Sequence, residues 1–472
     1  MTKRLKLGVS WALVPSVFAL AGPTMVEQLM QTAVQYIDTA MVGSLGTSAT
    51  AAVGSTTTVN WLLGSTIHAV AVGFLAFVAQ ARGAGKYDTA KRASSQAALA
   101  VIVLGLLFTA IPLLLSGFVP AWMQVDEAIR PIASKYFFII YTPMLFRVAN
   151  IIFGTLLRAV GDTKTPMKVG IIVNIINIIL NALLIYDPKA ITLFGNEITI
   201  PLAGLGVIGA ALASATAYAV GGVLIFIAVY RHPEITPKGQ KLRPDKAILA
   251  PCLKVAVPNA LQRFGTSLGY VAFAAMVNSL GEISTAAHTI ANTVESAFYI
   301  PGYGMQTATA TMTGNAYGAR DEKKIRDLFS TVVFLEVLMM ILSGAILFIF
   351  APAMMGIFSN DAEVISLGST VLRMVAVSEP FYGVSIIIEG MMQGMGKTTF
   401  PFVSNIVGMW LVRIVGTFIC INLFSMGLVS AWACMILHNV MLFALFLIYY
   451  LSGKWKARQR TDFHESREEA KA

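Results

Sequence analysis

Residues 161–166 read Gly-Asp-Thr-Lys-Thr-Pro and residues 396–401 read Gly-Lys-Thr-Thr-Phe-Pro, so a Gly-x-Thr-x-x-Pro element occurs twice, 235 residues apart. Further pairs at the same shift are Pro23 with Pro258, the Ser-Leu-Gly runs at 44–46 and 279–281, Ala51-Ala52 with Ala286-Ala287, and Gly83-Ala84 with Gly318-Ala319. Chance coincidences of Gly and Pro would not share one register without a gap. The chain is therefore interpreted as two related halves.

The composition indicates that both halves are embedded in a membrane. The chain has 472 residues, of which 56% are hydrophobic and 12% are charged, whereas a soluble domain carries about 25% charged residues. Apolar runs of about 18 residues or more predict spanning helices. The predicted spans are 11–37, 52–81, 93–118, 128–157, 165–186, 203–230, 249–278, 284–316, 327–351, 363–393, 400–424 and 427–452. We expect an all-α polytopic membrane protein with twelve transmembrane helices.

The basic residues predict the orientation. Most of the 34 Lys and Arg residues lie at the N-terminus, in the even-numbered connections between helices and in the C-terminal tail. Cytoplasmic loops carry an excess of Lys and Arg, so both termini are expected in the cytoplasm. The net charge of +10 is explained by this topology, and no nucleic-acid partner is expected.

The halves predict the domain organisation. Each contains six helices, an even number, so both enter the membrane from the same side and are parallel repeats related by a pseudo-two-fold axis along the membrane normal. We expect an N-terminal lobe at 1–235, a C-terminal lobe at 236–455 and a cytoplasmic tail at 456–472. Two such six-helix bundles would bury a cavity that opens alternately to each side, which is typical of a transporter.

Ionisable residues inside predicted spans are functional candidates, because each costs about 2.5–3.5 kcal/mol or more to insert. They are Glu27, Asp38, Arg147, Arg263, Glu295, Glu336, Arg373, Glu379, Glu389 and Arg413. Arg147, Arg263 and Glu295 could form buried ion pairs or contact a substrate, and the sequence leaves both interpretations open.

Two polar stripes stand out. Gln28, Gln31 and Gln35 precede Asp38 at helical spacing, which places all four side chains on one face. This stripe predicts a cation or proton site, and the alternative is a structural hydrogen bond near the outer end of the first helix.

The second stripe lies on the predicted fifth helix, where Asn174, Asn177 and Asn181 share one face. Such amides can coordinate an ion or hold helices together by hydrogen bonds. The two stripes could supply each other's polar partners.

Other residue types give no catalytic or metal motif. Cys252, Cys420 and Cys434 lie in apolar runs without metal-ligand spacing, and we interpret them as small apolar residues in packed helices. The histidines have no HExxH or cysteine partners, and the Gly-x-Gly-x-x-Gly at 204–209 does not follow a strand. An enzyme is the least expected class, and no metal or cofactor is expected beyond a coupling ion.

With the repeat and Asp38 established, the chain resembles the multidrug and toxic compound extrusion (MATE) family over nearly its full length. The stretches that carry the resemblance are Gln35-Tyr-Ile-Asp-Thr-Ala-Met-Val-Gly-Ser-Leu-Gly46, Arg158-Ala-Val-Gly-Asp-Thr-Lys-Thr-Pro166, Ala286-Ala-His-Thr-Ile-Ala291 and Thr313-Gly-Asn-Ala-Tyr-Gly318. The resemblance implies a cation-driven antiporter that expels organic, often cationic and amphipathic compounds.

The resemblance also implies a coupling site in the N-terminal lobe, made by a helix-1 aspartate, helix-5 polar residues and a helix-6 hydroxyl. These positions fall on Asp38, Asn177, Asn181 and Ser214. Many relatives carry a second aspartate where Asn181 stands. One carboxylate fewer weakens Na⁺ binding, so we favour H⁺ as the coupling ion and leave Na⁺ at Asp38 open.

The C-terminal lobe departs from the family. Gln262, Arg263 and Thr266 occupy a region where some relatives have a glutamate, and Tyr382 replaces an aspartate. A cation site there would need Glu295 or Glu389. The residues expected to line the substrate cavity are Gln31, Gln35, Asn150, Arg263, Glu295 and Tyr382.

The sequence therefore predicts a monomeric antiporter in the cytoplasmic (inner) membrane, with small organic molecules and lipid as its partners. One alternative is a lipid-linked precursor flippase of the same superfamily, which would have a strongly basic cavity. The other is an uncoupled channel or scramblase, whose flux would not respond to ΔpH or Na⁺.

Overall fold

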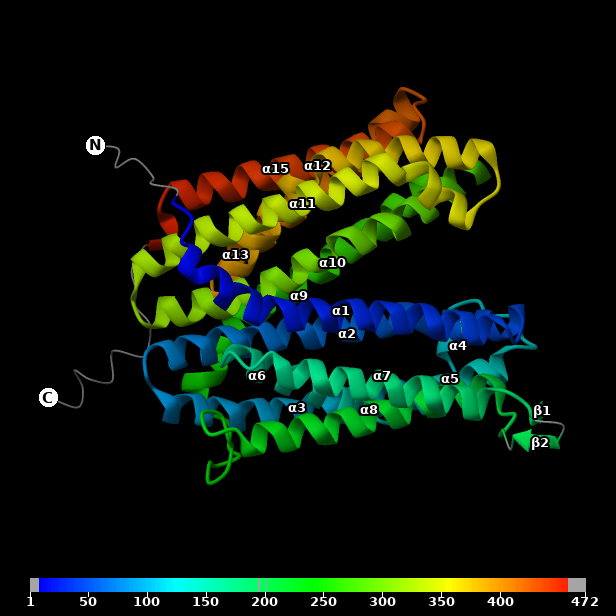
Figure 1. Cartoon of the computed structure of the whole chain (residues 1–472), viewed down its shortest axis with the longest axis horizontal. Coiled ribbons are helices and arrows are strands. Elements are labelled where there is room, and N and C mark those ends of the chain that lie inside the picture. The colour runs from blue at the N-terminus through cyan, green and yellow to red at the C-terminus, as the bar shows by residue number, and fades with distance from the viewer. Residues whose placement is uncertain (1–7, 194–195, 201, 457–472) are drawn as a thin grey trace, which may run out of the picture. The chain divides into compact units, whose positions relative to one another are not determined.

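The computed structural model describes residues 8–193, 196–200 and 202–456, and helices make up most of them (Figure 1). The remaining residues, which include nearly all of the predicted tail and the basic N-terminal residues, lie outside the described part. In chain order the elements are η1 (Trp11–Leu13), α1 (Val14–Gly43), α2 (Thr47–Gly83), α3 (Tyr87–Leu115), α4 (Val119–Trp122), α5 (Arg130–Tyr141), α6 (Met144–Ala159), α7 (Lys164–Ile185), β1 (Lys189–Leu193), β2 (Asn196–Ile200), α8 (Gly206–Arg231), α9 (Lys246–Asn278), α10 (Glu282–Gly318), α11 (Glu322–Phe358), α12 (Ala362–Gly394), α13 (Thr399–Val407), η2 (Gly408–Ile414), α14 (Val415–Phe418), η3 (Ile419–Leu423), α15 (Leu428–Leu451) and η4 (Lys454–Lys456).

In the described part of the chain, twelve long helical segments lie at the twelve predicted spans, with α5–α6 and residues 399–423 each counted as one, so the predicted all-helical fold class is confirmed. Within the described residues, nine segments are long and apolar enough to cross a membrane, and α5 with α6, bent by 45° between them, forms a tenth. α9 and α10 are also long, but their polar residues lower their mean hydropathy below that of a typical span.

The eleventh span is irregular. Residues 399–423 form one helical segment, in which α13 and α14 alternate with the π-helical turns η2 and η3. Single π turns are rare and occur frequently at functional sites. Each π turn also rotates the side chains that follow it, so the face of a residue in this span cannot be inferred from regular helical spacing.

Contacts divide the chain into two compact units. Unit 1 contains residues 1–25, 75–86 and 251–472, and unit 2 contains residues 26–74 and 87–250. α1 and α2 therefore each contribute to both units, which the predicted lobe boundary at 235–236 did not include. That boundary stays a prediction.

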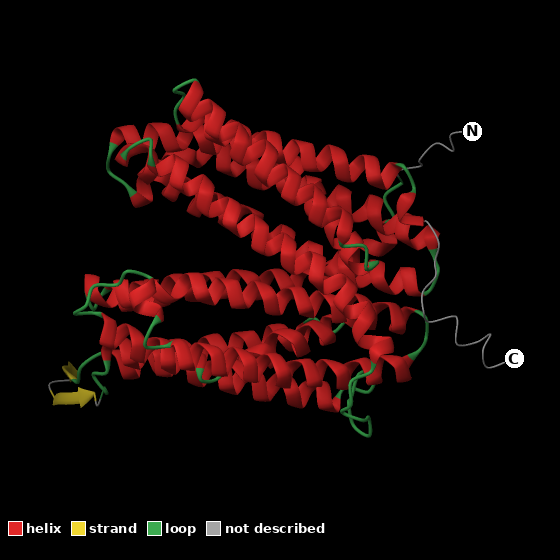
Figure 2. Ribbon diagram, turned by 180° about the vertical axis from the view of Figure 1, so that it is seen from behind, coloured by secondary structure: helices red, strands yellow, loops and turns green. Residues whose placement is uncertain are grey.

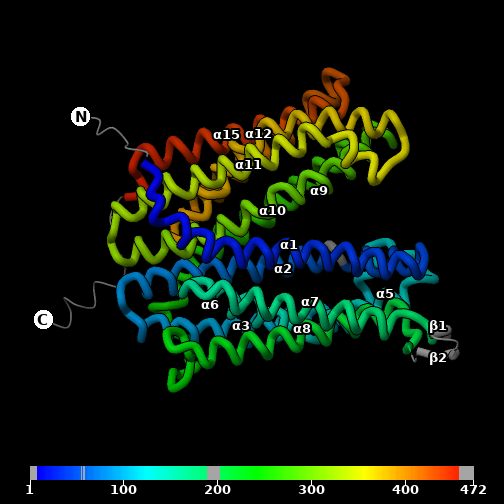
Figure 3. The backbone as a smooth tube through the Cα atoms, in the orientation of Figure 1, coloured from blue at the N-terminus to red at the C-terminus, as the bar shows by residue number. Residues whose placement is uncertain are grey.

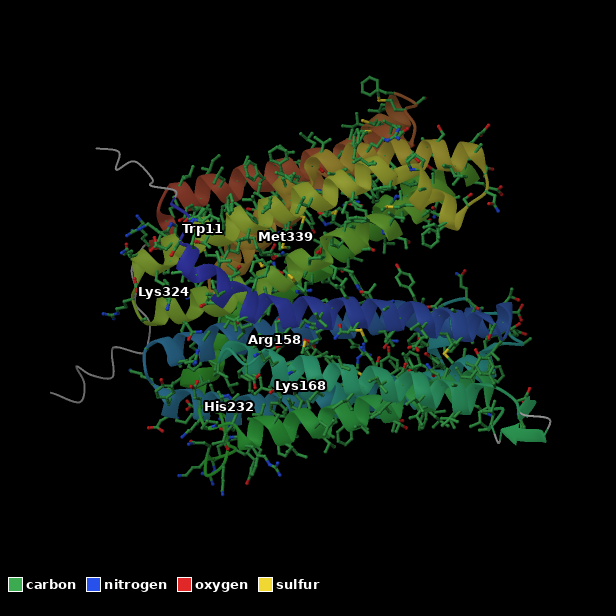
Figure 4. The ribbon with its side chains drawn as sticks, in the orientation of Figure 1. Trp11, Arg158, Lys168, His232, Lys324 and Met339 are labelled. Atoms are coloured by element: carbon green, nitrogen blue, oxygen red, sulfur yellow. The ribbon has the colours of Figure 1, made fainter. Side chains whose placement is uncertain are left out.

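Unit 2 is packed closely at glycines and joined by a buried ion pair. A side chain at Gly209 of α8 would collide with the carbonyl of Leu184 in α7, and one at Gly222 would lie 2.6 Å from the carbonyl oxygen of Phe146 in α6. Arg158 at the end of α6 (Figure 4) donates to both carboxylate oxygens of Glu27 in α1, each at 2.6 Å. Helices α1, α6, α7 and α8 are thereby held in one bundle.

A short antiparallel hairpin interrupts the helices of unit 2. β1 pairs with β2 in a register that sets Lys189 opposite Ile200 and Leu193 opposite Asn196. It lies between α7 and α8, at the end of unit 2 opposite to Arg158 and His232, which mark the ends of α6 and α8 (Figures 2 and 4). The hairpin thus lies in the connection between the predicted spans 165–186 and 203–230.

Buried apolar clusters lie along the helices of unit 1, and Figure 3 traces the backbone of these helices. One cluster includes Phe273 of α9, Ala291 of α10, Val371 of α12 and Trp432 of α15. Another, nearer the C-terminal end of α15, includes Phe329 of α11 and Phe446. Five long helices, α9, α10, α11, α12 and α15, contribute to the first of these clusters.

A reciprocal contact in unit 1 reproduces the sequence repeat in space. A side chain at Gly83 would collide with the carbonyl of Asn315, and one at Gly318 would collide with the carbonyl of Gln80. The shift of 235 residues exchanges these two contacts, because it converts Gln80 to Asn315 and Gly83 to Gly318. Such a self-complementary contact is the mark of a two-fold axis.

Candidate functional site

Asp38 lies near the C-terminal end of α1 and is half-buried in unit 2. Asn181 in the last part of α7 is 1% exposed, and its Nδ2 donates to Asp38 Oδ1 at 2.6 Å. A hydrogen bond to an ionised acceptor is stronger than one between neutral groups. The predicted meeting of the two polar stripes therefore occurs at this pair.

Asn177 and Ser214 extend the contact into a cluster of four side chains. Asn177 lies one helical turn before Asn181, and its amide is 3.1 Å from the Ser214 hydroxyl of α8. With the Asn177 amide turned end for end, its nitrogen donates to Asp38 Oδ1 at 2.8 Å and its oxygen accepts from Ser214. We call Asp38, Asn177, Asn181 and Ser214 the Asp38 cluster.

Not every residue of the two stripes joins this cluster. Gln31 and Gln35 are exposed, as residues that line an open surface would be. Asn174 is buried, and its Nδ2 has no hydrogen-bond partner within the described structure. Only the later amides of α7 reach Asp38, because Asp38 itself stands close to the end of α1.

Aromatic and basic side chains surround the Asp38 cluster, and sequence reasoning missed several of them. Tyr218 follows Ser214 by one turn of α8, and the Arg147 guanidinium lies 5.2 Å from the centre of its ring. Arg147 also donates to Asn60 at 2.8 Å. Tyr136 of α5 is buried close enough to Asp38 to interact with its charge. The spacing of Tyr218 from Ser214 was a usable signal.

Asn150 belongs to α6, and its side chain packs against α8. A Cβ at Gly221 would lie 3.0 Å from its amide nitrogen. The role of Asn150 in substrate binding stays a prediction.

The position in unit 1 that matches Asp38 has a different chemistry. It is Phe273, which is 1% exposed. The Arg413 guanidinium, buried on the π turn η2, lies 4.2 Å from the centre of the Phe273 ring and 4.9 Å from that of Tyr270. At this matched position unit 1 therefore has an aromatic ring packed against a buried cation, whereas unit 2 has a carboxylate.

Polar atoms near Arg413 lack partners in the described structure. Both ring nitrogens of His438, the Nε1 of Trp432 and the Nε of Arg413 itself make no hydrogen bond there. Glu295 is 7% exposed and interacts with the charge of Arg413, but no ion pair within 4.0 Å joins them among the described residues. An ion pair was one of the two roles predicted for Arg147, Arg263 and Glu295. None of the three forms one within 4.0 Å among the described residues.

A second carboxylate of unit 1 is held by amides. Glu389 Oε1 of α12 accepts from Gln262 at 2.9 Å and from Gln393 at 3.3 Å. Arg263 donates to Asn259 at 3.1 Å and is close enough to Glu389 to interact with its charge. Of the two glutamates that could substitute in this lobe, Glu389 therefore has the more complete set of partners.

Three tyrosines form a cluster in the same unit. The Tyr299 ring meets Tyr303 and Tyr382 edge to face, with centroids 5.7 and 5.9 Å apart. The Tyr303 and Tyr382 hydroxyls are 3.1 Å apart. We call these residues the tyrosine cluster. It combines the predicted residue Tyr382 with two aromatic residues of α10 that sequence reasoning did not single out.

Comparison with known proteins follows the same two halves. A family model described as MatE matches residues 23–183 and 258–419, and the starts of the two matches differ by the repeat shift. The chain is 26% identical over 439 residues to a probable multidrug resistance protein NorM of Thermotoga maritima, covering 93% of this chain and 92% of that one. It is 24% identical over 445 residues to the probable multidrug resistance protein YoeA of Bacillus subtilis, covering 93% of each.

Solved structures share the fold. One, of MATE in complex with MaL6, superimposes with a TM-score of 0.86 at 21% identity and covers 97% of this chain and 99% of its own. Another, of a MOP superfamily transporter from Pyrococcus furiosus, gives a TM-score of 0.85 at 22% identity and covers 97% and 100%.

Proposed function

The chain belongs to the MatE family of multi-pass membrane transporters, and from this premise we propose that it is a cation-coupled antiporter exporting organic, often cationic and amphipathic compounds. The names of the relatives, which describe multidrug resistance proteins, support this substrate class. The export would proceed by alternating access across the cytoplasmic (inner) membrane, with the lobes opening in turn to each side.

The Asp38 cluster is the observation that carries the proposal. A carboxylate in a spanning helix is retained at an energetic disadvantage and marks an ion or proton pathway by default. Asp38 receives amide donors from Asn181 and Asn177. Protonation removes the negative charge that these donors stabilise, so it weakens the link between α1 and α7. Loading and release of a proton can thereby change the position of α1.

The composition of the Asp38 cluster favours H⁺ over Na⁺. A hard cation such as Na⁺ needs several oxygen ligands. Asp38 is the single carboxylate of the cluster, and the Nδ2 of Asn181 donates to it. The cluster therefore offers Asp38 hydrogen-bond donors in place of a cage of oxygens.

The tyrosine cluster is the proposed contact for the cationic part of a substrate. Organic ammonium groups bind to the faces of aromatic rings, and Tyr299, Tyr303 and Tyr382 present three rings from α10 and α12. Glu389 is close enough to Tyr303 to interact with it electrostatically, and it would add a negative charge nearby. This assigns cation recognition to unit 1 and coupling to unit 2.

Efflux of a cationic dye from proteoliposomes under an imposed ΔpH tests the coupling. We expect the wild type to transport and Asp38→Asn to lose at least about nine-tenths of its rate, equivalent to about 1.4 kcal/mol. Glu363→Gln is the matched control, because Glu363 is an exposed carboxylate in the first turn of α12. Full ΔpH-driven efflux by Asp38→Asn would contradict the proposal.

A second variant tests the choice of ion. Asn181→Asp adds a carboxylate oxygen beside Asp38, so efflux driven by ΔNa⁺ should increase relative to efflux driven by ΔpH. The same two gradients applied to the wild type separate antiport from an uncoupled channel or scramblase, whose flux would follow neither gradient.

A further inference from the structure

Two of the three cysteines meet in unit 1, although their positions in the sequence give no reason to pair them. Cys420 lies on the π turn η3, and Cys434 lies in the second turn of α15. Their sulfur atoms are 3.9 Å apart, and both are free thiols. The third cysteine, Cys252, is 3% exposed in α9.

The packing around the two sulfurs explains why they approach. A Cβ at Gly416 would lie 3.2 Å from Cys434 Sγ, so the absence of a side chain there lets the sulfur rest against the helix. Cys420 follows Gly416 by four residues, at the start of the π turn η3. The Met426 amide donates to the Cys420 carbonyl at 2.9 Å, which closes the short connection between η3 and α15.

The pair lies at the end of its helices where oxidising conditions are expected. No Lys or Arg occurs between Arg413 and Lys454, so the connection at 424–427 has no basic residue. Lys397 and Lys454 lie at the opposite ends of the same two spans. The positive-inside rule therefore places this connection outside the cytoplasm, and disulfides form and persist on that side.

We infer that Cys420 and Cys434 are a redox modification site that closes to an intramolecular disulfide. A disulfide holds two sulfurs about 2.05 Å apart, so closure requires the two side chains to rotate from their present separation of 3.9 Å. The bond would join the irregular eleventh span to the last helix near their shared connection. This inference depends on the orientation proposed above only for the source of the oxidant.

The oxidant is a small-molecule or protein disulfide. The thiolate of the more exposed Cys420 attacks one sulfur of the oxidant, and one thiol leaves. The Cys434 thiolate then attacks Cys420 Sγ, forms the internal S–S bond and displaces the second thiol. The two protons lost by the cysteine thiols are taken up, by way of water, by the two displaced thiolates. The two cysteines are thereby oxidised, and the disulfide of the oxidant is reduced to two thiols.

Thiol counting on the purified full-length protein tests this site. The protein is treated with an aromatic disulfide, freed of excess reagent, unfolded and alkylated with a maleimide. We expect one alkylated cysteine after oxidation and three after reduction, with an intact mass lower by two hydrogens in the oxidised form. The midpoint of thermal unfolding should rise on oxidation and fall again on reduction.

Three variants make the result specific. Cys252→Ser should keep both the mass change and the thermal shift, whereas Cys420→Ser and Cys434→Ser should lose them and give only the mixed disulfide with the oxidant. Three alkylated cysteines after oxidation, or a bond that involves Cys252, would overturn the inference. The counting needs no transport, so it stands apart from the test of antiport.

Discussion

Asp38 in unit 2 and Phe273 in unit 1 occupy matching positions of the sequence repeat, and their surroundings are opposite in charge and in hydrogen bonding. Asp38 is a carboxylate that receives amide donors. Phe273 is an apolar ring against a buried guanidinium. A repeated scaffold therefore does not require the same chemistry at every matched position.

The two regions also differ in how completely their polar groups are paired. Three side chains surround Asp38 with compatible donors and acceptors. Around Arg413, nitrogens of His438 and Trp432 remain without partners in the described structure. Buried polar groups are normally hydrogen-bonded, so the Asp38 cluster is the more completely paired of the two regions.

The largest difference in transport is expected between substitutions at the two matched positions, Asp38 and Phe273. In one proteoliposome assay, Asp38→Asn should reduce ΔpH-driven efflux about tenfold or more. Phe273→Leu, a substitution of similar apolar character, should change it by less than about twofold. Equal losses in both variants would show that the two halves share coupling, and the comparison would be wrong.

A large effect on stability is expected at the ion pair of unit 2. Glu27→Gln removes the carboxylate charge that faces the Arg158 guanidinium, whose side chain is 15% exposed. Removing one partner of a buried pair costs about 3–5 kcal/mol. Thermal unfolding in detergent should show a clearly lower midpoint.

The exposed pair of unit 1 is the control for that measurement. Glu322 and Arg326 are each 45% exposed and 3.5 Å apart, so Glu322→Gln should cost at most about 1 kcal/mol. If the two variants lost similar amounts of stability, the burial of the Glu27–Arg158 pair would not explain the effect.

The reciprocal contacts of Gly83 and Gly318 test whether matched positions of the repeat are also equal in energy. Gly83→Ala and Gly318→Ala each force a methyl group against a backbone carbonyl of the partner segment. Overpacking of this kind costs about 1–3 kcal/mol, and the two losses should be equal within error. Gly427→Ala, with open space around it, should be neutral. Unequal losses would show that the contact no longer obeys the repeat.

The smallest expected effect lies in the tyrosine cluster. Tyr382→Leu removes one aromatic face and the hydroxyl contact to Tyr303. A cation–π contact at a partly exposed site contributes about 0.5–1 kcal/mol, so the KM for a cationic dye should rise about two- to fivefold. A neutral substrate of similar size serves as the control, and an equal rise for both would assign Tyr382 to packing alone.

Much of the fold could be predicted because it depends on local composition and on one repeated register. The apolar runs predicted the helices, and the shift of 235 residues predicted the relation between Gly83 and Gly318. The meeting of Asp38 with Asn181 also followed, because both polar stripes need partners in an apolar medium.

The remaining features depend on how helices rotate and bend against each other. Helical spacing placed Asn174 on the same stripe as Asn181, yet only the later residues of α7 reach Asp38. Cys420 and Cys434 lie on different spans, and the π turns η2 and η3 alter which face Cys420 presents. No periodicity in the sequence encodes that rotation.

The reciprocal contact of Gly83 and Gly318 has a meaning for how this chain arose. In a homodimer, one glycine codon would supply both sides of such a contact, and a mutation would damage both at once. In this chain each side has its own codon, because the two copies are fused. Selection can then preserve the shared contact while other positions drift apart, so an ancestral pair of identical sites could become one aspartate and one phenylalanine.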